Sequence, residues 1–272
     1  MNSINKYIRT FNIGLRNSLE YRFDFITSLL FKVLPVFIYF FLWKVIYVSN
    51  GMESNSINGI TLKQVISYVI FVQFIDMLTL PGGIESKVMS EIKDGEISKY
   101  LVKPVNYFFY NLSLIAANKT IFMMPLLVTL AVIMGIFKEY LETFNNIFIV
   151  VPLIISLIIS FMLRYLINFC LGLLAFWMTE ISSLYVMTNR ITLFLSGMLF
   201  PLAFLPEELY VVSSFLPFHY IGFFPAMVAI GNIEQADLIK GIVTSGIWVC
   251  VISMLSIILW RAGLKKYVSV GG

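Results

Sequence analysis

The chain has 272 residues, of which 59% are hydrophobic and only 12% charged, and its formal net charge is +4 at pH 7. Its mean hydropathy is +0.89, and apolar stretches of about 18 residues or more recur along its length, more than a water-soluble core of this size buries. The composition therefore excludes a soluble globular protein and predicts an all-α, polytopic membrane protein. A transmembrane β-barrel is excluded as well, because barrel strands alternate strictly over about ten residues whereas these runs are solidly apolar.

Residues 1–24 predict an amphipathic helix. Apolar side chains recur at helical spacing, with charged residues on the other faces; they are Ile4, Ile8, Phe11, Leu15 and Leu19. Such a helix lies in the membrane interface, or it packs on its own protein as an ordinary surface helix. The sequence leaves both alternatives open.

Six long apolar runs predict six membrane-spanning helices, since about 20 apolar residues cross the hydrocarbon core. In chain order the spans are residues 25–48, 62–80, 105–137, 147–177, 183–202 and 238–260. The third and fourth are long enough to tilt. The second ends at Pro81-Gly82-Gly83, which is a helix stop.

Residues 84–104 lie between the second and third spans and contain four lysines and four acidic residues. They are called here the charged segment. Apolar residues at i, i+4 and i+8 predict a short helix that Asp94-Gly95 interrupts, and a second short helix follows. The predicted helix-turn-helix lies under the membrane, where a soluble partner can contact it. The alternative is a solvated connector whose surface ion pairs contribute little energy.

Prolines interrupt the apolar sequence before the sixth span, at Pro201, Pro206, Pro217 and Pro225. No straight helix can cross the membrane there, and non-helical backbone at membrane depth must be buried in protein or line water. Residues 203–232 are therefore expected to form short re-entrant helices on the outer side.

The distribution of basic residues predicts the orientation. With both termini in the cytoplasm, twelve lysines and arginines lie on the inner side and three on the outer side. The inner residues are Lys6, Arg9, Arg16, Arg22, Lys87, Lys93, Lys99, Lys103, Arg190, Arg261, Lys265 and Lys266, and the outer ones are Lys63, Lys138 and Lys240. The positive-inside rule then places the charged segment in the cytoplasm and residues 203–232 outside.

The sequence holds no G-x-x-x-x-G-K-[ST] loop to bind nucleotide phosphates and no H-E-x-x-H or G-x-S-x-G motif. We therefore expect no catalytic activity in this chain, no metal or cofactor bound by it, and no nucleic-acid partner.

Two stretches resemble a known family. Residues 92–105, IKDGEISKYLVKPV, are similar to the cytoplasmic motif I-x-x-G-E-[IL]-D-x-[YF]-L-[LV]-[KR]-P-V of permeases in type-two ABC exporters. Residues 195–225, from Leu-Ser-Gly through Leu-Pro-Phe, are similar to the outer signature of the same family. Ser98 departs from the first motif, since an acidic residue often occupies that position. The number of spans, the amphipathic first helix and the order of both motifs extend the resemblance over essentially the whole chain.

The resemblance implies the permease subunit of an ATP-driven exporter in a bacterial plasma membrane. Two permeases, identical or sister proteins, would work with two copies of a separate ATPase that binds ATP and magnesium. The cargo would be amphipathic or hydrophobic: a drug, an antimicrobial peptide, a lipid or a glycan. Contacts that couple the permease to the ATPase are expected at Lys93, Asp94, Gly95, Glu96 and Lys99, whose mixed charges suit docking.

Charged residues also lie inside predicted spans, where ionisable groups are functional candidates. Asp76 and Arg164 lie about fourteen and seventeen residues from the outer ends of their spans, so their depths differ by only about 4–5 Å. We expect them to form a structural pair, which is favoured over a cargo or proton site. Lys119 lies in the inner part of the third span and could instead reach the interface.

Two other classes stay open. In an ion-coupled secondary transporter, Asp76 or Arg164 would titrate or bind the ion, and a broken helix would recur near the midplane of two repeated halves. No such repeat is found in the sequence. A membrane scaffold that transports nothing is compatible with the composition. Co-purification with an ATPase separates the exporter from both.

Overall fold

The structure is a computed structural model that describes residues 3–20, 22–49, 56–57, 59–141, 147–231 and 233–267. Its long helices are α2 (Arg22–Ser49), α3 (Leu62–Thr79), α6 (Tyr107–Ile136), α7 (Val150–Leu173) and α11 (Gln235–Leu264). Its other helices are α1 (Ser3–Glu20), α4 (Ile84–Lys93), α5 (Ser98–Leu101), α8 (Ser182–Leu195), α9 (Glu207–Phe215) and α10 (Phe223–Ala229). Single 3₁₀ turns are η1 (Lys138–Tyr140), η2 (Ile147–Ile149), η3 (Leu174–Phe176), η4 (Leu202–Phe204) and η5 (Pro217–Tyr220). Two short antiparallel strands, β1 (Ser56–Ile57) and β2 (Ile60–Thr61), form a hairpin.

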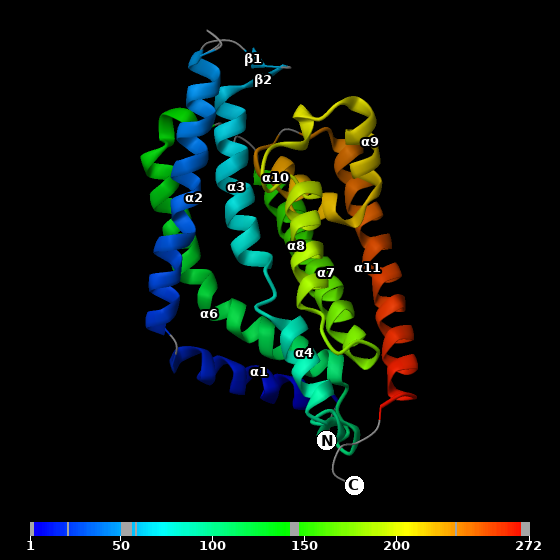
Figure 1. The fold of residues 1–272 in the computed structure, drawn as a ribbon. Coiled ribbons are helices and arrows are strands. Elements are labelled where there is room, and N and C mark those ends of the chain that lie inside the picture. The colour runs from blue at the N-terminus through cyan, green and yellow to red at the C-terminus, as the bar shows by residue number, and fades with distance from the viewer. Residues whose placement is uncertain are drawn as a thin grey trace.

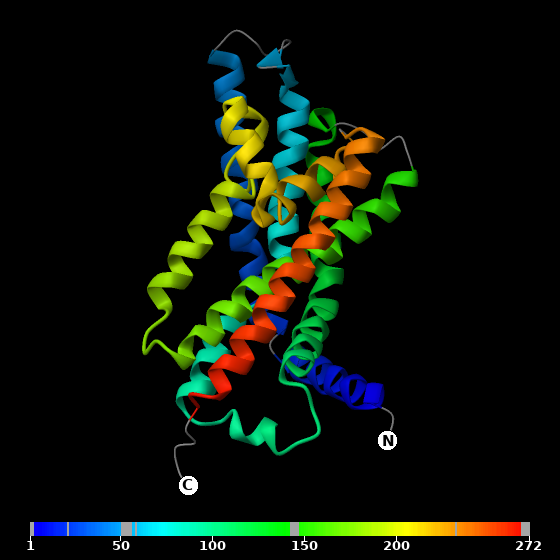
Figure 2. The same cartoon turned by 90° about the vertical axis from the view of Figure 1, so that its right-hand side faces the viewer.

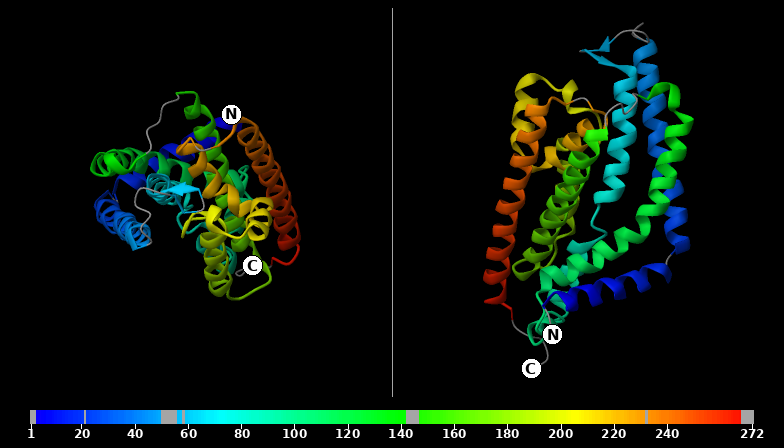
Figure 3. Two further views of the ribbon diagram at one scale, coloured as in Figure 1. Left: turned by 90° about the horizontal axis from the view of Figure 1, so that it is seen from above. Right: turned by 180° about the vertical axis from the view of Figure 1, so that it is seen from behind.

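The long helices stand side by side as an upright bundle (Figures 1 and 2). Helix α1 crosses the lower end of this bundle, where α4 and the last turns of α11 also lie (Figure 1). The β hairpin and α9 lie at the opposite end, and the lower half of α6 bends across the bundle toward α4, above α1 (Figure 3). The N-terminal helix, the charged segment and the C-terminal end therefore share one end of the molecule.

Within the described residues, four helical stretches are long and apolar enough to cross a membrane, or five if one bent pair counts as a span. They are Leu62–Lys93, which joins α3 and α4, then Tyr107–Ile136, Val150–Phe176 and Gln235–Leu264. In α2 the described apolar part, Val33–Ser49, is shorter than these. The chain is a polytopic membrane protein with four to five candidate spans.

The fifth expected span, residues 183–202, is shorter in the structure than its apolar run. Helix α8 has 14 residues, about 21 Å, which is less than the roughly 30 Å hydrocarbon core. It ends because Gly197 adopts a φ of +74°, a conformation that residues with a Cβ resist. The carbonyl of Gly197 accepts a hydrogen bond of 2.8 Å from the Tyr68 hydroxyl, so the chain turns back onto α3.

Helix α3 is the centre of the bundle. Its most apolar part is 67% buried, whereas that of α6 is only 11% buried, so most of the surface of α6 is exposed. Helix α10 packs against α3 and α7 and is almost entirely buried. Between α9 and the η5–α10 segment the chain bends by 79°, as in a broken span or a re-entrant loop.

Helix α1 packs across α6 through small residues. Gly14 lies so close to α6 that an added Cβ would stand 2.8 Å from the Cβ of Ala117. Thr10 is buried on the same side, while Ile8 and Ile13 remain exposed. The helix therefore contacts its own protein and still leaves apolar side chains on its outer surface.

Candidate functional site

The charged segment folds as α4, a tight turn and α5. The turn depends on Gly95, whose φ of +73° is in the left-handed region that favours glycine. The turn is closed by backbone bonds from Asp94 N–H to Ser90 carbonyl (2.8 Å) and from Ile97 N–H to Glu91 carbonyl (3.1 Å). The helix-turn-helix is thus fixed by its own backbone.

The side of the charged segment that faces away from the bundle is exposed and carries mixed charges. Lys93, Asp94, Glu96 and Lys99 are all exposed, and Lys99 forms an ion pair with Glu96 one turn earlier. The hydrogen bond that the Lys99 ammonium donates to the Glu96 carboxylate raises the pKa of Lys99. Such an exposed pair contributes little to stability, so these charges are available for recognition rather than needed for folding.

An apolar pair lies next to these charges. Leu101 is exposed, and Val102 is 83% exposed. Exposed aliphatic side chains beside charged ones make a surface that a soluble partner can bury, with the charges setting its register.

The side of α4 that faces the bundle packs tightly on α7. Val88 is fully buried, and a Cβ added at Gly172 of α7 would stand 2.7 Å from the Val88 Cβ. Ile84 and Ile92 are buried in the same apolar cluster. Because the two helices are in such close contact, we expect a displacement of α4 to be transmitted to α7.

Glu91 links the charged segment to a spanning helix. Its carboxylate is buried and accepts hydrogen bonds from the hydroxyls of Tyr100 (3.0 Å) and Tyr107 (2.5 Å). Burial and the neighbouring Glu91 carboxylate raise the pKa of Tyr100, which keeps it a donor. The carboxylate therefore joins α4, α5 and the start of α6.

Both ends of the chain hold the charged segment. The Tyr267 hydroxyl, beyond α11, donates to the Gly95 carbonyl at 2.6 Å. From α1, the Lys6 ammonium donates to the Pro104 carbonyl, and the Tyr7 hydroxyl accepts a 3.1 Å bond from the Asn106 N–H. The segment is thus fixed at its turn and at its exit.

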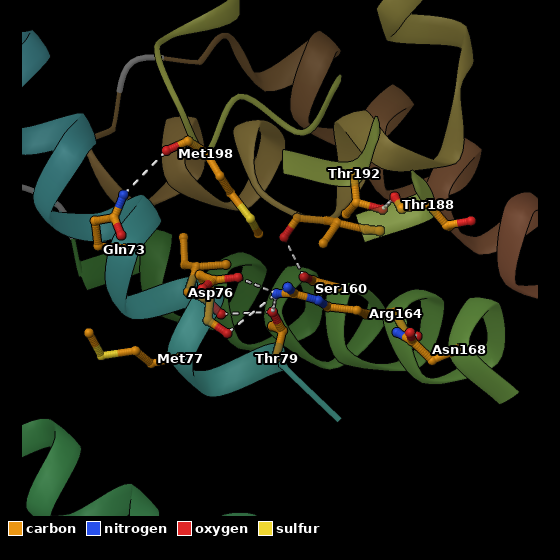
Figure 4. A network of polar contacts seen from close by, with 12 residues as sticks. Gln73, Asp76, Met77, Thr79, Ser160, Arg164, Asn168, Thr188, Thr192 and Met198 are labelled. Atoms are coloured by element: carbon orange, nitrogen blue, oxygen red, sulfur yellow. Dashed lines mark hydrogen bonds and ion pairs between the residues drawn. The ribbon is translucent and has the colours of Figure 1, made fainter. Parts of the chain in front are cut away.

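The second candidate site lies inside the bundle, where the structure brings Asp76 and Arg164 together (Figure 4). Arg164 is only 3% exposed, and its Nη1 lies 2.5 Å from Asp76 Oδ1. The same nitrogen donates to the Asp76 carbonyl and to the Thr79 hydroxyl, both at 3.4 Å. The Asp76 side chain is 29% exposed, so the pair is buried on the arginine side only.

These contacts place two basic side chains at the C-terminal end of α3. Arg164 reaches it from α7, and the Lys119 ammonium reaches it from α6, donating a 2.9 Å bond to the Met77 carbonyl. Lys119 therefore turns toward α3 rather than toward the interface. A helix C-terminus has free carbonyls and about half a negative charge, so both cations stabilise the point where α3 ends.

Helices α3 and α7 also form hydrogen bonds with the chain that follows α8 and with the chain that precedes α10. Gln73 of α3 donates to the Met198 carbonyl at 3.2 Å, and Ser160 of α7 donates to the Ile221 carbonyl at 2.5 Å (Figure 4). A polar network therefore runs along α3 and α7 from the end of α3 toward α10.

The structure keeps the two expected sets of residues apart. Lys93, Asp94, Glu96 and Lys99 form one exposed surface around the buried Gly95 at the lower end of the bundle. The Asp76–Arg164 pair lies inside the bundle. Only residues 80–83 separate α3, which carries the pair, from α4, which leads into the surface. Across the residues that the structure describes, no group of three or more His, Cys, Asp or Glu is arranged to hold a metal ion.

Comparison with known proteins identifies the family. The family model described as ABC-2 family transporter protein matches residues 33–271, which include all the long helices apart from the start of α2, and both candidate sites. No curated protein matches the sequence. The chain therefore belongs to the ABC-2 transporter family and is one of its membrane proteins.

Proposed function

We propose that this chain is the permease subunit of an ATP-driven exporter, and that a separate ATPase subunit docks on the charged segment. Membership of the ABC-2 family supports an ATPase partner. In the proposed assembly, two permeases, identical or sister proteins, work with two ATPases that bind ATP and magnesium. The cargo, which passes between the permeases, is amphipathic or hydrophobic.

The observation that carries this proposal is the two-sided character of the charged segment. The side that faces away from the bundle exposes Lys93, Asp94, Glu96 and Lys99. The side that faces the bundle is packed on α7 and hydrogen-bonded to the start of α6. A solvated connector needs only the first of these properties. A surface that receives a mechanical displacement needs both.

The proposed mechanism is a shift between two populations of the permease. ATP binding draws the two ATPases together and displaces the charged segment. The movement passes through Val88 to α7, through Glu91 to α6, and through residues 80–83 to α3. ATP acts because it binds the ATPases differently in the two states.

The proposal includes six membrane crossings by α2, α3, α6, α7, α8 and α11, in the plasma membrane of a bacterium. Both termini and the charged segment would be cytoplasmic, with residues 203–232 outside. The twelve-to-three distribution of basic residues supports this orientation. For α8, the short helix together with the turn at residues 196–202 would complete the crossing.

The proposal is tested by co-expressing the permease with its ATPase. The double change Asp94→Lys, Glu96→Lys reverses two exposed charges, so we expect the permease to stay folded while the complex weakens or ATP turnover no longer drives export. Assembly, ATPase rate and transport are measured on the same preparation. A matched control is Glu207→Lys, Glu208→Lys, two exposed neighbouring acids in the first turn of α9, at the other end of the molecule. Wild-type values of all three quantities in the Asp94, Glu96 variant would reduce the charged segment to a connector.

The alternative, an ion-coupled secondary transporter, would use Asp76 and Arg164. The contacts of Arg164 with the Asp76 carbonyl and with Thr79 favour a role in ending α3 over an ion-binding role. If the chain were an ion-coupled transporter, the purified permease would move an ion down a pH or sodium gradient in vesicles without any ATPase. We expect no such movement.

A further inference from the structure

A pocket opens where α3 ends, between the last residues of α3, residues 80–82 and the middle of α6. Its volume is about 180 Å³. A single water needs only about 10–15 Å³ of such space, so the pocket has room for a ligand group much larger than a water molecule.

The lining of this pocket is asymmetric in polarity. Asn118 and Lys119 are its polar side chains, and the remaining walls are mainly apolar, including Leu80, Phe122 and Leu126. Lys119 is oriented by its 2.9 Å bond to the carbonyl of Met77, another residue that lines the pocket. The pocket thus presents a positioned ammonium at one place and hydrocarbon around it.

The mouth of the pocket is on the exposed, apolar surface of α6. Asn118 and Met123 both line the pocket and are both exposed, and α6 buries only 11% of its apolar window. A ligand can therefore enter sideways from the bilayer. A basic side chain at this depth in a spanning helix is a functional candidate.

We propose that this pocket binds an anionic amphiphile. Its negative headgroup contacts the Lys119 ammonium and the Asn118 amide, and its alkyl chain lies along Phe122, Met123 and Leu126. A phosphodiester is such a headgroup, because its negative oxygens accept hydrogen bonds from both an ammonium and an amide.

The site is tested on the purified permease without any ATPase, so its failure and a failure of the exporter proposal are distinguishable. The melting temperature is measured in detergent with added dioleoyl phosphatidylglycerol and, separately, with zwitterionic dioleoyl phosphatidylcholine. A ligand present at about a hundredfold excess over Kd raises Tm by on the order of 5 °C for a protein of this size. We expect phosphatidylglycerol to raise the Tm of the wild type by this amount more than phosphatidylcholine does.

Three variants assign the effect to the pocket. Lys119→Gln removes the charge and is expected to abolish the difference between the two lipids, while Lys119→Arg keeps it. Because Lys119 also holds the Met77 carbonyl, each variant is compared with itself in the two lipids, which cancels a change in basal stability. Asn118→Trp fills the mouth without altering the lysine and is also expected to abolish the difference. Thr120→Trp, an exposed position on α6 that does not line the pocket, is its control.

Two sources share this chemistry, a resident lipid of the inner leaflet and an exported amphiphile. Native mass spectrometry separates them. A resident lipid stays bound through purification, whereas an exported amphiphile is found only after addition. Equal stabilisation of the wild type by both lipids would overturn the proposal. So would full retention of the phosphatidylglycerol effect in both Lys119→Gln and Asn118→Trp.

Discussion

The hydroxyl of Tyr267, past the end of α11, donates a hydrogen bond of 2.6 Å to the carbonyl of Gly95 in the turn between α4 and α5. These two residues are 172 positions apart in the chain. The bond ties the C-terminal helix to the centre of the surface proposed to receive the ATPase. It gives that surface a direct mechanical connection to α11 in addition to its contacts with α6 and α7.

Tyr267→Phe is expected to leave the fold intact and to loosen the turn. Removing one such bond costs about 0.5–1.5 kcal/mol, so Tm should fall by only a few degrees. Because α11 then follows the turn less closely, the number of ATP molecules hydrolysed per cargo molecule should rise. The control is Tyr220→Phe, which removes a comparable tyrosine-to-backbone bond of 2.9 Å to Ser214 at the other end of the molecule. An equal change in both variants would mean that the Tyr267 bond serves stability alone.

Glu91 is the buried acceptor between the charged segment and α6, so Glu91→Gln should cost more than an exposed change. The amide offers one acceptor oxygen where the carboxylate has two, and neither the Tyr100 nor the Tyr107 hydroxyl can then donate to a charged oxygen. We expect a loss of about 1–3 kcal/mol in the free energy of unfolding. Glu96→Gln, on the exposed side of the same segment, should stay within about 0.5 kcal/mol. Denaturant titration in detergent measures both, and equal losses would contradict a buried role for Glu91.

The comparison of these two acids shows what the sequence can predict here. The spacing of Ile84, Val88 and Ile92 and the break at Asp94-Gly95 predict the two short helices, because both signals are local. The same spacing places Glu91 beside the apolar stripe and gives no sign of its burial. Its partners Tyr100 and Tyr107 lie 9 and 16 positions away, and only the packing of α4, α5 and α6 brings them to it.

Similar reasons explain the other differences. The matched depth of Asp76 and Arg164 is a property of two separate spans, so the sequence suggests their proximity. The apolar run that continues past α8 hides the end of that helix at Gly197, which depends on a tertiary contact with Tyr68. The direction in which Lys119 points also depends on where α3 ends, since a long side chain at that depth has two possible polar targets.

Asp76→Asn should destabilise the protein by leaving the Arg164 guanidinium without a countercharge. Breaking a buried pair costs about 3–5 kcal/mol. The lower part of this range is expected, because the Asp76 side chain is 29% exposed and Arg164 retains the Asp76 carbonyl and Thr79 as acceptors. Asp237→Asn, at an exposed position in the first turn of α11, is the control.

A charge exchange tests the pairing directly. Asp76→Arg combined with Arg164→Asp should recover part of the lost stability, measured by denaturant titration. If Asp76→Asn instead unfolds like the wild type and Arg164→Gln changes transport alone, the pair is not a structural one and a cargo role is favoured.

The orientation is checked by labelling single cysteines in a background in which Cys170 and Cys250 are replaced by alanine. A cysteine at Glu208 should react with an impermeant maleimide in intact cells. One at Glu96 should react only after the membrane is opened. Both positions are exposed, so a lack of labelling reports the membrane barrier rather than burial. Labelling of the Glu96 position in intact cells would contradict the predicted orientation.

Gly95→Val should damage the charged segment without touching any spanning helix. The φ of +73° at this position is costly for a β-branched residue, by about 1–3 kcal/mol, so the turn should rearrange and move Asp94 and Glu96 from their positions. We expect the permease to remain folded in detergent, as judged by size-exclusion chromatography and Tm. Its complex with the ATPase should weaken, or the ATPase rate of the complex should become independent of transport.

The matched control is Gly246→Val in α11, where an added Cβ meets no atom within 4 Å and φ is helical. Normal assembly and transport in Gly95→Val would show that the turn geometry does not matter to the partner, and equal defects in both variants would point to the general cost of valine in place of glycine.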